Sequence, residues 1–242
     1  MTVESTGIPA GEMTGTAPGT DQTTGNGIRL LKKAQALSGL VFAAFLVLHL
    51  LNTWLAALGP AAYDGAQQEL RTVYQALAVE VVVLAALLIH IGVGVVRILI
   101  EPKRSLSLRA RLHRYAGFFM MLVIGGHILA VRGPSWFFDV HPGFAGLAFS
   151  IAAVPGYFYP YYFLLALAGF YHGLNGVSIA AGRLGWPVRV PSDILRRLSM
   201  IAGVLTALAL MGFGGLFFDV GDVYASPFAR LAMEITGVTF TP

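Results

Sequence analysis

Hydrophobic residues gather in five long blocks along the chain, and shorter, more polar segments separate them. The blocks cover roughly residues 34–58, 73–100, 112–131, 157–181 and 198–218. Each contains about 20 residues or more, which is the length that an α-helix needs to cross a hydrocarbon layer of ~30 Å. The pattern predicts an all-α integral membrane protein in which residues 28–220 form a bundle of five transmembrane helices.

The segments outside these blocks are shorter or more polar. Residues 1–27 are rich in Thr, Gly and Pro, which predicts a flexible N-terminal tail. No basic segment precedes a short apolar stretch there, so we do not expect a signal peptide. Residues 143–154 are apolar but too few to span, and they predict an interfacial or re-entrant helix. In the C-terminal segment, 221–242, apolar residues at helical spacing predict a short interfacial helix.

The composition supports a membrane location and argues against several kinds of functional site. Of the 242 residues, 56% are hydrophobic and 12% are charged, whereas soluble domains carry about twice that charged fraction. The chain has no cysteine, which excludes a cysteine-ligated zinc site, an iron–sulfur cluster held by thiolates and an internal disulfide. The formal net charge of +4 is scattered over several loops, so we do not expect nucleic-acid binding.

The basic residues are distributed unequally between the two sides of the predicted bundle. Thirteen of the 16 fall on the side of the N-terminus: Arg29, Lys32, Lys33, Arg97, Lys103, Arg104, Arg109, Arg111, Arg114, Arg183, Arg189, Arg196 and Arg197. Only Arg71, Arg132 and Arg230 fall on the other side. The positive-inside rule therefore predicts a cytoplasmic N-terminus, and five spans place the C-terminus outside.

Four of the predicted spans each contain one histidine within the apolar run: His49, His90, His127 and His172. Ionisable residues inside a membrane are costly, so each is a candidate functional residue. At a helical rise of about 1.5 Å per residue, the first and third lie roughly 22 Å from the basic end of their helices, and the other two roughly 14–15 Å. Two imidazoles at each of two depths predict two b-type haems, with axial ligand pairs His49–His127 and His90–His172.

A single intramembrane histidine also serves as an interhelical hydrogen-bonding group or a proton relay, and the matched depths are what favour haem ligation. Glycines near three of the histidines, such as Gly92, Gly126 and Gly173, offer room for a flat macrocycle, although small residues are common in membrane helices. Of the remaining histidines, His113 is expected to contact a haem propionate, a quinone or a partner subunit. His141 is expected to be an ordinary loop residue.

The histidine spacings of 41, 37 and 45 residues, together with the segments around them, resemble a known family. The segments are Gly39…His49, His90-Ile-Gly-Val-Gly-Val-Val-Arg97, His113-Arg114-Tyr115-Ala116-Gly117 and His172-Gly173-Leu174-Asn175-Gly176. Over roughly residues 30–220 the chain resembles the single-chain, five-helix dihaem cytochrome b anchor of succinate:quinone oxidoreductases and quinol:fumarate reductases.

The resemblance implies a redox subunit of a bacterial cytoplasmic membrane, without dicarboxylate chemistry of its own. In that family the anchor binds a flavoprotein and an iron–sulfur subunit at the cytoplasmic face, and electrons pass from succinate through flavin, clusters and haems to a quinone. His90 and His172 would hold the inner haem, and His49 and His127 the outer one. Some fumarate reductases have a glutamate two residues before the fourth ligand; here Phe170 stands there, which favours succinate oxidation.

Other polar residues are candidate contacts of the haem propionates or of the quinone, either a menaquinone or a ubiquinone. The propionate candidates are Arg97, His113, Arg114, Arg132, Tyr171 and Asn175. Quinone reduction needs a hydrogen-bond donor and a source of protons. The quinone candidates are Asp64 and Glu80 on the outer side and Gln35, Ser38, Arg111 and His113 on the inner side. Helix-end arginines often serve only as headgroup anchors, and an interfacial carboxylate is an equal alternative for Glu80.

Two other functions compete with this interpretation. Dihaem cytochrome b subunits of nitrate reductases and related dehydrogenases place pairs of ligands on the same span, whereas this chain has one histidine per helix. A transporter or proton channel would use the histidines and Glu80 as relays. Such proteins often show inverted repeats and broken helices, and the sequence shows no repeat beyond the recurring histidine.

Overall fold

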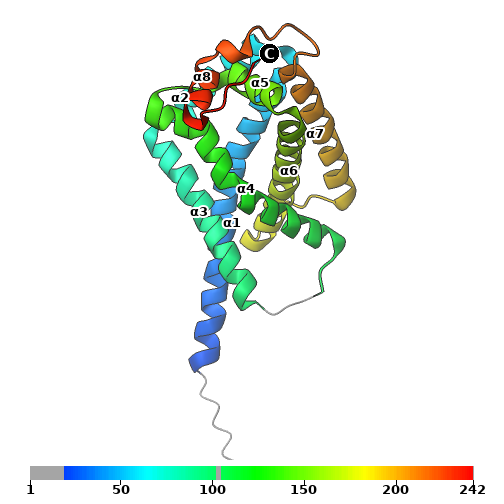
Figure 1. Cartoon of the computed structure of the whole chain (residues 1–242). Helices are drawn as coiled ribbons and strands as arrows, with labels where there is room; N and C mark the ends of the chain where they lie inside the picture. Colours follow the sequence, from blue (N-terminus) through cyan, green and yellow to red (C-terminus); the bar gives the residue numbers. More distant parts are fainter. Residues whose placement is uncertain (1–18, 102–104, 242) are drawn as a thin grey trace, which may run out of the picture.

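The computed structural model describes residues 19–101 and 105–241, and every regular element within them is helical. Five helices are long and apolar enough to cross a membrane: α1 (Gly19–Trp54), α3 (Leu77–Ile100), α4 (Leu108–Phe138), α6 (Pro155–Leu184) and α7 (Ser192–Phe213) (Figure 1). The predicted all-α fold with five membrane-spanning helices is therefore confirmed.

Several helices extend beyond the hydrophobic blocks. The first helix, α1, begins at Gly19, so residues 19–27, expected in the flexible tail, are helical, while residues 1–18 lie outside the described part. In Figure 1 the start of α1, in blue, projects beyond the other helices. Helix α4 continues to Phe138, past Pro134. Hydropathy marks only the residues that suit hydrocarbon, so it underestimates helices that continue into the aqueous layer.

Helix α1 is the central element of the bundle, because it packs along both α3 and α6, and α6 in turn packs against α4 and α7. The close approach of α1 and α6 depends on small residues. A Cβ atom on Gly173 would lie 3.1 Å from the Leu46 side chain of α1, and Gly169 faces the same leucine. These two glycines therefore serve helix packing, as small residues do in membranes. Comparably extensive backbone contact is not found between α1 and α4, or between α3 and α6, in the described residues.

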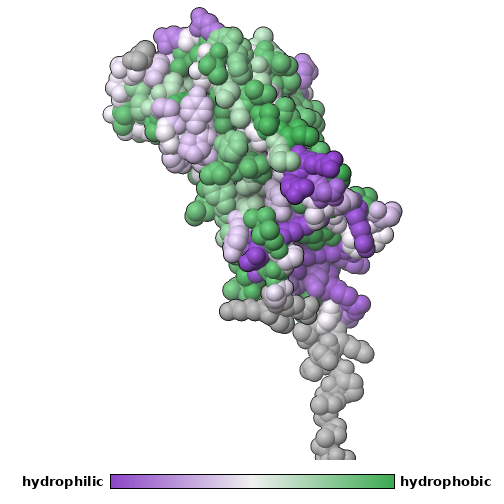
Figure 2. All heavy atoms as spheres, turned by 90° about the vertical axis from the view of Figure 1, so that its right-hand side faces the viewer, coloured by the Kyte–Doolittle hydropathy of each residue, from purple (hydrophilic) through white to green (hydrophobic). Residues whose placement is uncertain are grey.

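The other elements form a cap at the end of the bundle where the chain finishes. They are η1 (Leu55–Leu58), α2 (Pro60–Tyr74), α5 (Gly143–Ala153), η2 (Val223–Ala225) and α8 (Pro227–Thr236). The opposite end holds the start of α1, the α3–α4 connection and the α6–α7 connection, and we call it the basic end. Hydrophilic residues gather toward the lower part of the face in Figure 2, while apolar residues cover much of the remainder.

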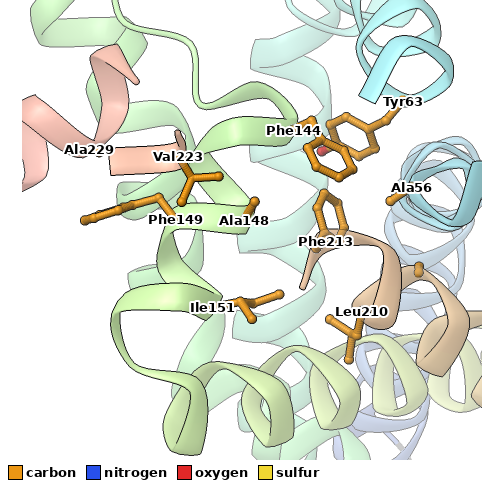
Figure 3. Close-up of a cluster of buried hydrophobic side chains, with 11 residues drawn as sticks. Ala56, Tyr63, Phe144, Ala148, Phe149, Ile151, Leu210, Phe213, Val223 and Ala229 are labelled. Atoms are coloured by element: carbon orange, nitrogen blue, oxygen red, sulfur yellow. The ribbon is translucent and has the colours of Figure 1, made fainter. Parts of the chain in front are cut away.

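The hydrophobic core lies in the cap, where α5 meets α2, α7 and α8 (Figure 3). Phe144 and Ile151 of α5 are 1% and 2% exposed, and Phe213 of α7 is 1% exposed. Residues 143–153, expected to form an interfacial or re-entrant helix, are thus a helix packed inside protein. The short C-terminal helix is present as α8, with Leu231 buried. The sequence did not predict α2.

Polar contacts join helices within the cap and at the cap end of the bundle. The Phe144 amide at the start of α5 donates to Asp64 Oδ1 of α2 at 2.8 Å, and the Trp54 indole donates to the Thr206 hydroxyl of α7 at 3.1 Å. The first bond satisfies one of the amides that every helix start leaves without an intrahelical partner. Asp64, a candidate quinone contact, therefore has a structural partner.

A glycine on α7 sets how closely α7 approaches η1. A Cβ atom on Gly212 would overlap the backbone carbonyl of Ala56, whereas one on Gly203 of the same helix would lie 4.0 Å from the Leu167 and Phe163 side chains. We expect Gly212→Ala to lower the free energy of unfolding by about 1–3 kcal/mol, as overpacking does. Gly203→Ala is the matched control. Thermal unfolding of both variants in detergent measures the difference, and equal midpoints would contradict this packing.

Candidate functional site

The four histidines inside the membrane-spanning helices form two facing pairs. The ring centres of His49 on α1 and His127 on α4 are 6.1 Å apart, with their planes at 76°. Those of His90 on α3 and His172 on α6 are also 6.1 Å apart, at 86°. The structure thus brings together the same pairs that depth along the sequence predicted. In each pair the two rings belong to helices that do not pack closely together.

The distance between the rings suits a metal ion placed between them. A metal–imidazole bond is about 2.0–2.1 Å long and a ring centre lies about 1.2 Å from its nitrogen, so two imidazoles on opposite sides of one metal have centres about 6.3 Å apart. An edge-to-face pair of aromatic rings has a similar separation, 4.5–7 Å. The distance alone therefore does not distinguish a ligand pair from a packing pair.

Hydrogen bonds of one pair indicate which nitrogen is free. His90 Nδ1 lies 3.0 Å from the Gln35 carbonyl oxygen, and His172 Nδ1 lies 3.0 Å from the His113 carbonyl oxygen. A carbonyl oxygen only accepts, so in each ring Nδ1 carries the proton and Nε2 of the neutral ring keeps its lone pair. Histidines that bind metals usually donate their other N–H in this way. This pair therefore has the arrangement of ligands, beyond what ring packing requires.

Two glycines make room for the same two rings. A Cβ atom on Gly39 of α1 would lie 2.8 Å from His90 Cε1 and Nδ1, and one on Gly117 of α4 would lie 2.9 Å from His172 Cε1. Each glycine lies one helical turn after the residue whose carbonyl accepts the imidazole proton. Carbonyl and glycine together fix the ring orientation.

The two halves of the site are built alike. On α1 the order is Gln35, Gly39, His49, and on α4 it is His113, Gly117, His127, with 78 residues between equivalent positions. This internal correspondence was not evident in the sequence, where only the histidines recurred. The constant offset of 78 residues between the accepting carbonyls, the glycines and the second histidines is the signal that reveals it.

The two pairs lie at two levels of the bundle. The His90 ring lies against Gly39 of α1, and His49 follows ten residues later on that helix, which corresponds to about 15 Å of helix. On α4 the spacing from Gly117 to His127 is also ten residues. Because both helices give the same spacing, the levels are parallel, with His90–His172 nearer the basic end.

A cluster of basic side chains surrounds Gln35 at the basic end. The Gln35 side-chain oxygen accepts hydrogen bonds from Arg97 of α3 and, at 3.4 Å, from Arg183 of α6. Arg97 also binds Glu101 through contacts of 2.9–3.0 Å, and Lys32 lies 3.6 Å from the same carboxylate. Two cations thus share one carboxylate, and the third, Arg183, binds the neutral Gln35. Sequence analysis had singled out Arg97 and Gln35 but not Arg183, which lies 11 residues after His172.

Near the cap end, two sequence candidates bind one another. Arg132 of α4 makes a two-pronged contact to Glu80 of α3, with Nε–Oε1 at 2.6 Å and Nη2–Oε2 at 2.9 Å. The Trp136 indole donates to the same carboxylate at 3.2 Å, and the Arg132 guanidinium lies 5.2 Å from the Trp136 ring centre. Such a bidentate pair leaves little hydrogen-bonding capacity for a quinone at Glu80.

Several other candidates connect helices instead of facing the imidazole pairs. The buried Asn175 side chain of α6 accepts from Arg109 Nε of α4 at 2.7 Å, and the Tyr171 hydroxyl donates to the Arg109 carbonyl at 3.4 Å. The Ser38 hydroxyl donates to Ala34 O of its own helix at 2.8 Å. Arg111 and Arg114 are exposed on α4.

The remaining histidines have different surroundings. His113 stacks on His172, with ring centres 4.0 Å apart and planes at 7°, and its Nδ1 is buried without a hydrogen-bond partner in the described part of the chain. Its neighbour is therefore an imidazole of the candidate site. His141 lies between α4 and α5, as expected of a loop residue, and burial followed by the charge of Arg71 lowers its pKa.

The donor set fits a haem better than a bare metal ion. Among residues 19–101 and 105–241, no group of three or more His, Cys, Asp or Glu side chains is placed to hold a metal. A haem iron takes four ligands from its macrocycle and needs only two from the protein, and each facing pair supplies two. Gly92 of α3 and Gly125 and Gly126 of α4 have no atom within 4 Å of a Cβ position, so open space lies beside two of the four helices that carry the rings.

No protein-family model matches the sequence, and no curated protein matches it significantly. The interpretation of the site therefore depends on its own geometry.

The charge cluster at the basic end predicts a pH dependence of stability. Partial burial would raise the pKa of Glu101, but hydrogen bonds and charge from Arg97, and then the charge of Lys32, outweigh it and lower the pKa below its ordinary 4.5. A carboxyl with a lowered folded-state pKa stabilises above the unfolded pKa, and this contribution is lost as pH falls through the folded value. We expect the melting temperature to fall below about pH 4.5, and less so in Glu101→Gln. If the melting temperatures of the unmodified protein and of Glu101→Gln fell equally with pH, this role of Glu101 would be contradicted.

Proposed function

We propose that the chain is a dihaem cytochrome b subunit of a membrane-bound respiratory complex. In this proposal His90 and His172 hold the haem nearer the basic end, and His49 and His127 hold the haem nearer the cap. One observation carries this proposal. In each of the two histidine pairs the ring centres lie 6.1 Å apart, on two helices that otherwise do not pack closely together. In the His90–His172 pair, Nδ1 of each ring donates to a backbone carbonyl, which leaves Nε2 available to bind an iron.

The protein residues position and tune the two groups. When bound, each haem supplies one-electron redox chemistry at its iron. The Gln35 and His113 carbonyls fix the ring orientation of His90 and His172 and increase their basicity as ligands. Two levels about 15 Å apart along α1 and α4 give electrons a route along the membrane normal.

The basic cluster is suited to a haem propionate at the level of His90 and His172. Arg97 and Arg183 converge on the neutral Gln35 oxygen, and within residues 19–101 and 105–241 Arg97 pairs with Glu101 while Arg183 has no carboxylate in ion-pair contact. A propionate would balance the excess charge and accept from both guanidinium groups. Among the residues singled out in the sequence, this favours Arg97 as a propionate contact. It also makes Gln35 a candidate propionate contact instead of a quinone contact.

The specific complex that we propose is a succinate:quinone oxidoreductase, since the resemblance of the histidine segments is to its anchor subunit. The basic end would face the cytoplasm of a bacterial cell by the positive-inside rule, and a flavoprotein and an iron–sulfur subunit would dock there. Electrons from succinate would then reach a menaquinone or ubiquinone. Phe170 packs against Trp54 with ring centres 6.1 Å apart, so an apolar contact occupies the position of the glutamate of some fumarate reductases.

Two alternatives remain distinguishable by experiment. Another respiratory cytochrome b subunit would share the haems but not the succinate-oxidising partners. A transporter that relays protons through the histidines and Glu80 would bind no haem, and the bidentate pairing of Glu80 with Arg132 counts against a mobile proton carrier there.

Single histidine variants test the assignment of the ligands. The protein isolated from membranes should show a reduced-minus-oxidised spectrum of b type with two haems per chain. His90→Ala and His172→Ala should each remove the same haem, and His49→Ala and His127→Ala the other, because an iron with one axial imidazole is poorly held. His141→Ala is the control and should keep both. Absence of haem from the unmodified protein would overturn the proposal. If other pairs of histidine variants lost the same haem, the pairing of the ligands would be overturned.

Glycine variants test the orientation of the rings without removing a ligand. We expect Gly117→Ala to displace the His172 ring, which would lie 2.9 Å from the new methyl carbon. The haem nearer the basic end should then show a shifted potential and altered low-spin signals in electron paramagnetic resonance, while the other haem is unchanged. Gly156→Ala at the cap end of α6, the helix that carries His172, meets no atom within 4 Å and is the control. Equal spectra for both variants would contradict the role assigned to Gly117.

A further inference from the structure

A groove separate from the histidine pairs runs between α4, α6 and α7. Its volume is about 1080 Å³, and none of the four paired histidines lines it. The walls are mainly apolar, with Leu112 from α4, Leu167 from α6, and Met200 and Val204 from α7. The groove exists because α6 packs against both α4 and α7, while extensive contact between α4 and α7 is not found in the described residues.

The mouth of the groove, at the basic end, is positively charged. Arg109 and Arg196 line it, together with Ser107 and Ser192. Arg109 is held by neutral oxygens, namely the Asn175 amide, the Val190 carbonyl and the Ser192 hydroxyl. In the described part of the chain neither guanidinium has a carboxylate within ion-pair distance, although Asp193 is close in sequence.

Two helix starts add to this charge. Helix α4 begins at Leu108 and α7 at Ser192, so Arg109 lies in the first turn of α4 and Arg196 directly follows the first turn of α7. The free amides of a first turn favour anions. Two guanidinium groups and two helix N-termini at one place form a site for a phosphate group. Guanidinium geometry matches phosphate oxygens particularly well.

Below the mouth, the groove has the length and lining of a lipid chain site. On α7 it extends from Ser192 to Ala207, which corresponds to about 22 Å of helix and exceeds the ~15 Å thickness of one hydrocarbon leaflet. Two turns below Ser192, the Ser199 hydroxyl oxygen is buried without a hydrogen-bond partner among the described residues and lines the groove. A buried hydroxyl of this kind favours a ligand with an acceptor oxygen at that depth.

We propose that this groove binds an anionic phospholipid of the inner leaflet. The phosphate lies at Arg109 and Arg196, an ester carbonyl accepts from Ser199, and an acyl chain lies along Leu167 and Val204. A neutral quinone head group would leave both guanidinium charges at the mouth without an anion, so the charge of the site favours the phospholipid. The site is independent of the histidine pairs.

The affinity for defined lipids tests the proposal. The full chain, purified with its cofactors and partner subunits and delipidated in detergent, is titrated with phosphatidylglycerol or with phosphatidylcholine of the same acyl chains. Native mass spectrometry and the melting temperature report binding. We expect phosphatidylglycerol to bind more tightly, and Arg196→Gln to weaken its binding about tenfold, the effect of losing one charge-assisted hydrogen bond. Arg197→Gln is the matched control, because it removes the same charge beside the groove and should leave the affinity unchanged.

A second variant tests the acyl channel without altering charge. Gly203 lines the groove, and a Cβ there would lie 4.0 Å from Leu167 and Phe163, so Gly203→Leu should fold and fill the channel. It should weaken binding of both lipids. Equal affinity for the two lipids, equal effects at Arg196 and Arg197, or unchanged binding in Gly203→Leu would overturn the proposal. Displacement of the lipid by a short-chain quinone at the same groove would also overturn it. Because lipid binding is measured by mass, the result does not depend on the haem assignment.

Discussion

The separation of α1 from α4, and of α3 from α6, is the constraint on which the rest of the structure depends. Helices in a membrane associate by close packing, yet the two helix pairs that carry the facing histidines do not approach one another. Helix α4 has one buried residue, Gly133, in 31, and α3 has two, Ala86 and Leu87, in 24. Most side chains of α3 and α4 are therefore not covered by other parts of the protein, whereas the cap has a well-packed core. A flat cofactor at each histidine pair would supply the missing packing.

The correspondence between the α1–α3 and α4–α6 halves explains how two sites arise in one chain. In each half, one helix offers a carbonyl and a glycine to an imidazole of its neighbour, and ten residues later contributes its own imidazole to the other level. The levels still differ in charge. Near His90, Arg97 and Lys32 share Glu101 and Arg183 binds the neutral Gln35, while near the cap Arg132 and Glu80 neutralise one another. Excess positive charge stabilises an added electron, so this charge difference would make two haems bound as proposed unequal in potential.

Hydropathy predicted the five spans, and helical rise predicted which histidines lie at equal depth, because both properties depend on position along one helix. Contacts between side chains of different helices were harder to predict from the sequence. Asn175 and Arg132 were candidates for propionates, but their partners are Arg109 and Glu80, 66 and 52 residues away. The amphipathic α2 and the burial of α5 were missed for a related reason. An apolar stretch too short to span looks the same whether lipid or protein covers it.

Helix α7 lies outside the histidine pairs, and its contacts show why the bundle needs it. Its last turns bring Phe213 into the cap core, and Thr206 holds Trp54 at the end of α1. The cap in turn holds α5 through Asp64 of α2. Helix α7 thus fixes the position of α1 at the cap end. Contact between α1 and α4 does not serve this purpose, because these two helices do not pack closely in the described residues. Its N-terminal half has no comparable partner across from α6, which is why a groove with a charged mouth remains there. A lipid in that groove would join α4 to α7, and so support the helix that carries Gly117 and His127 from its outer side.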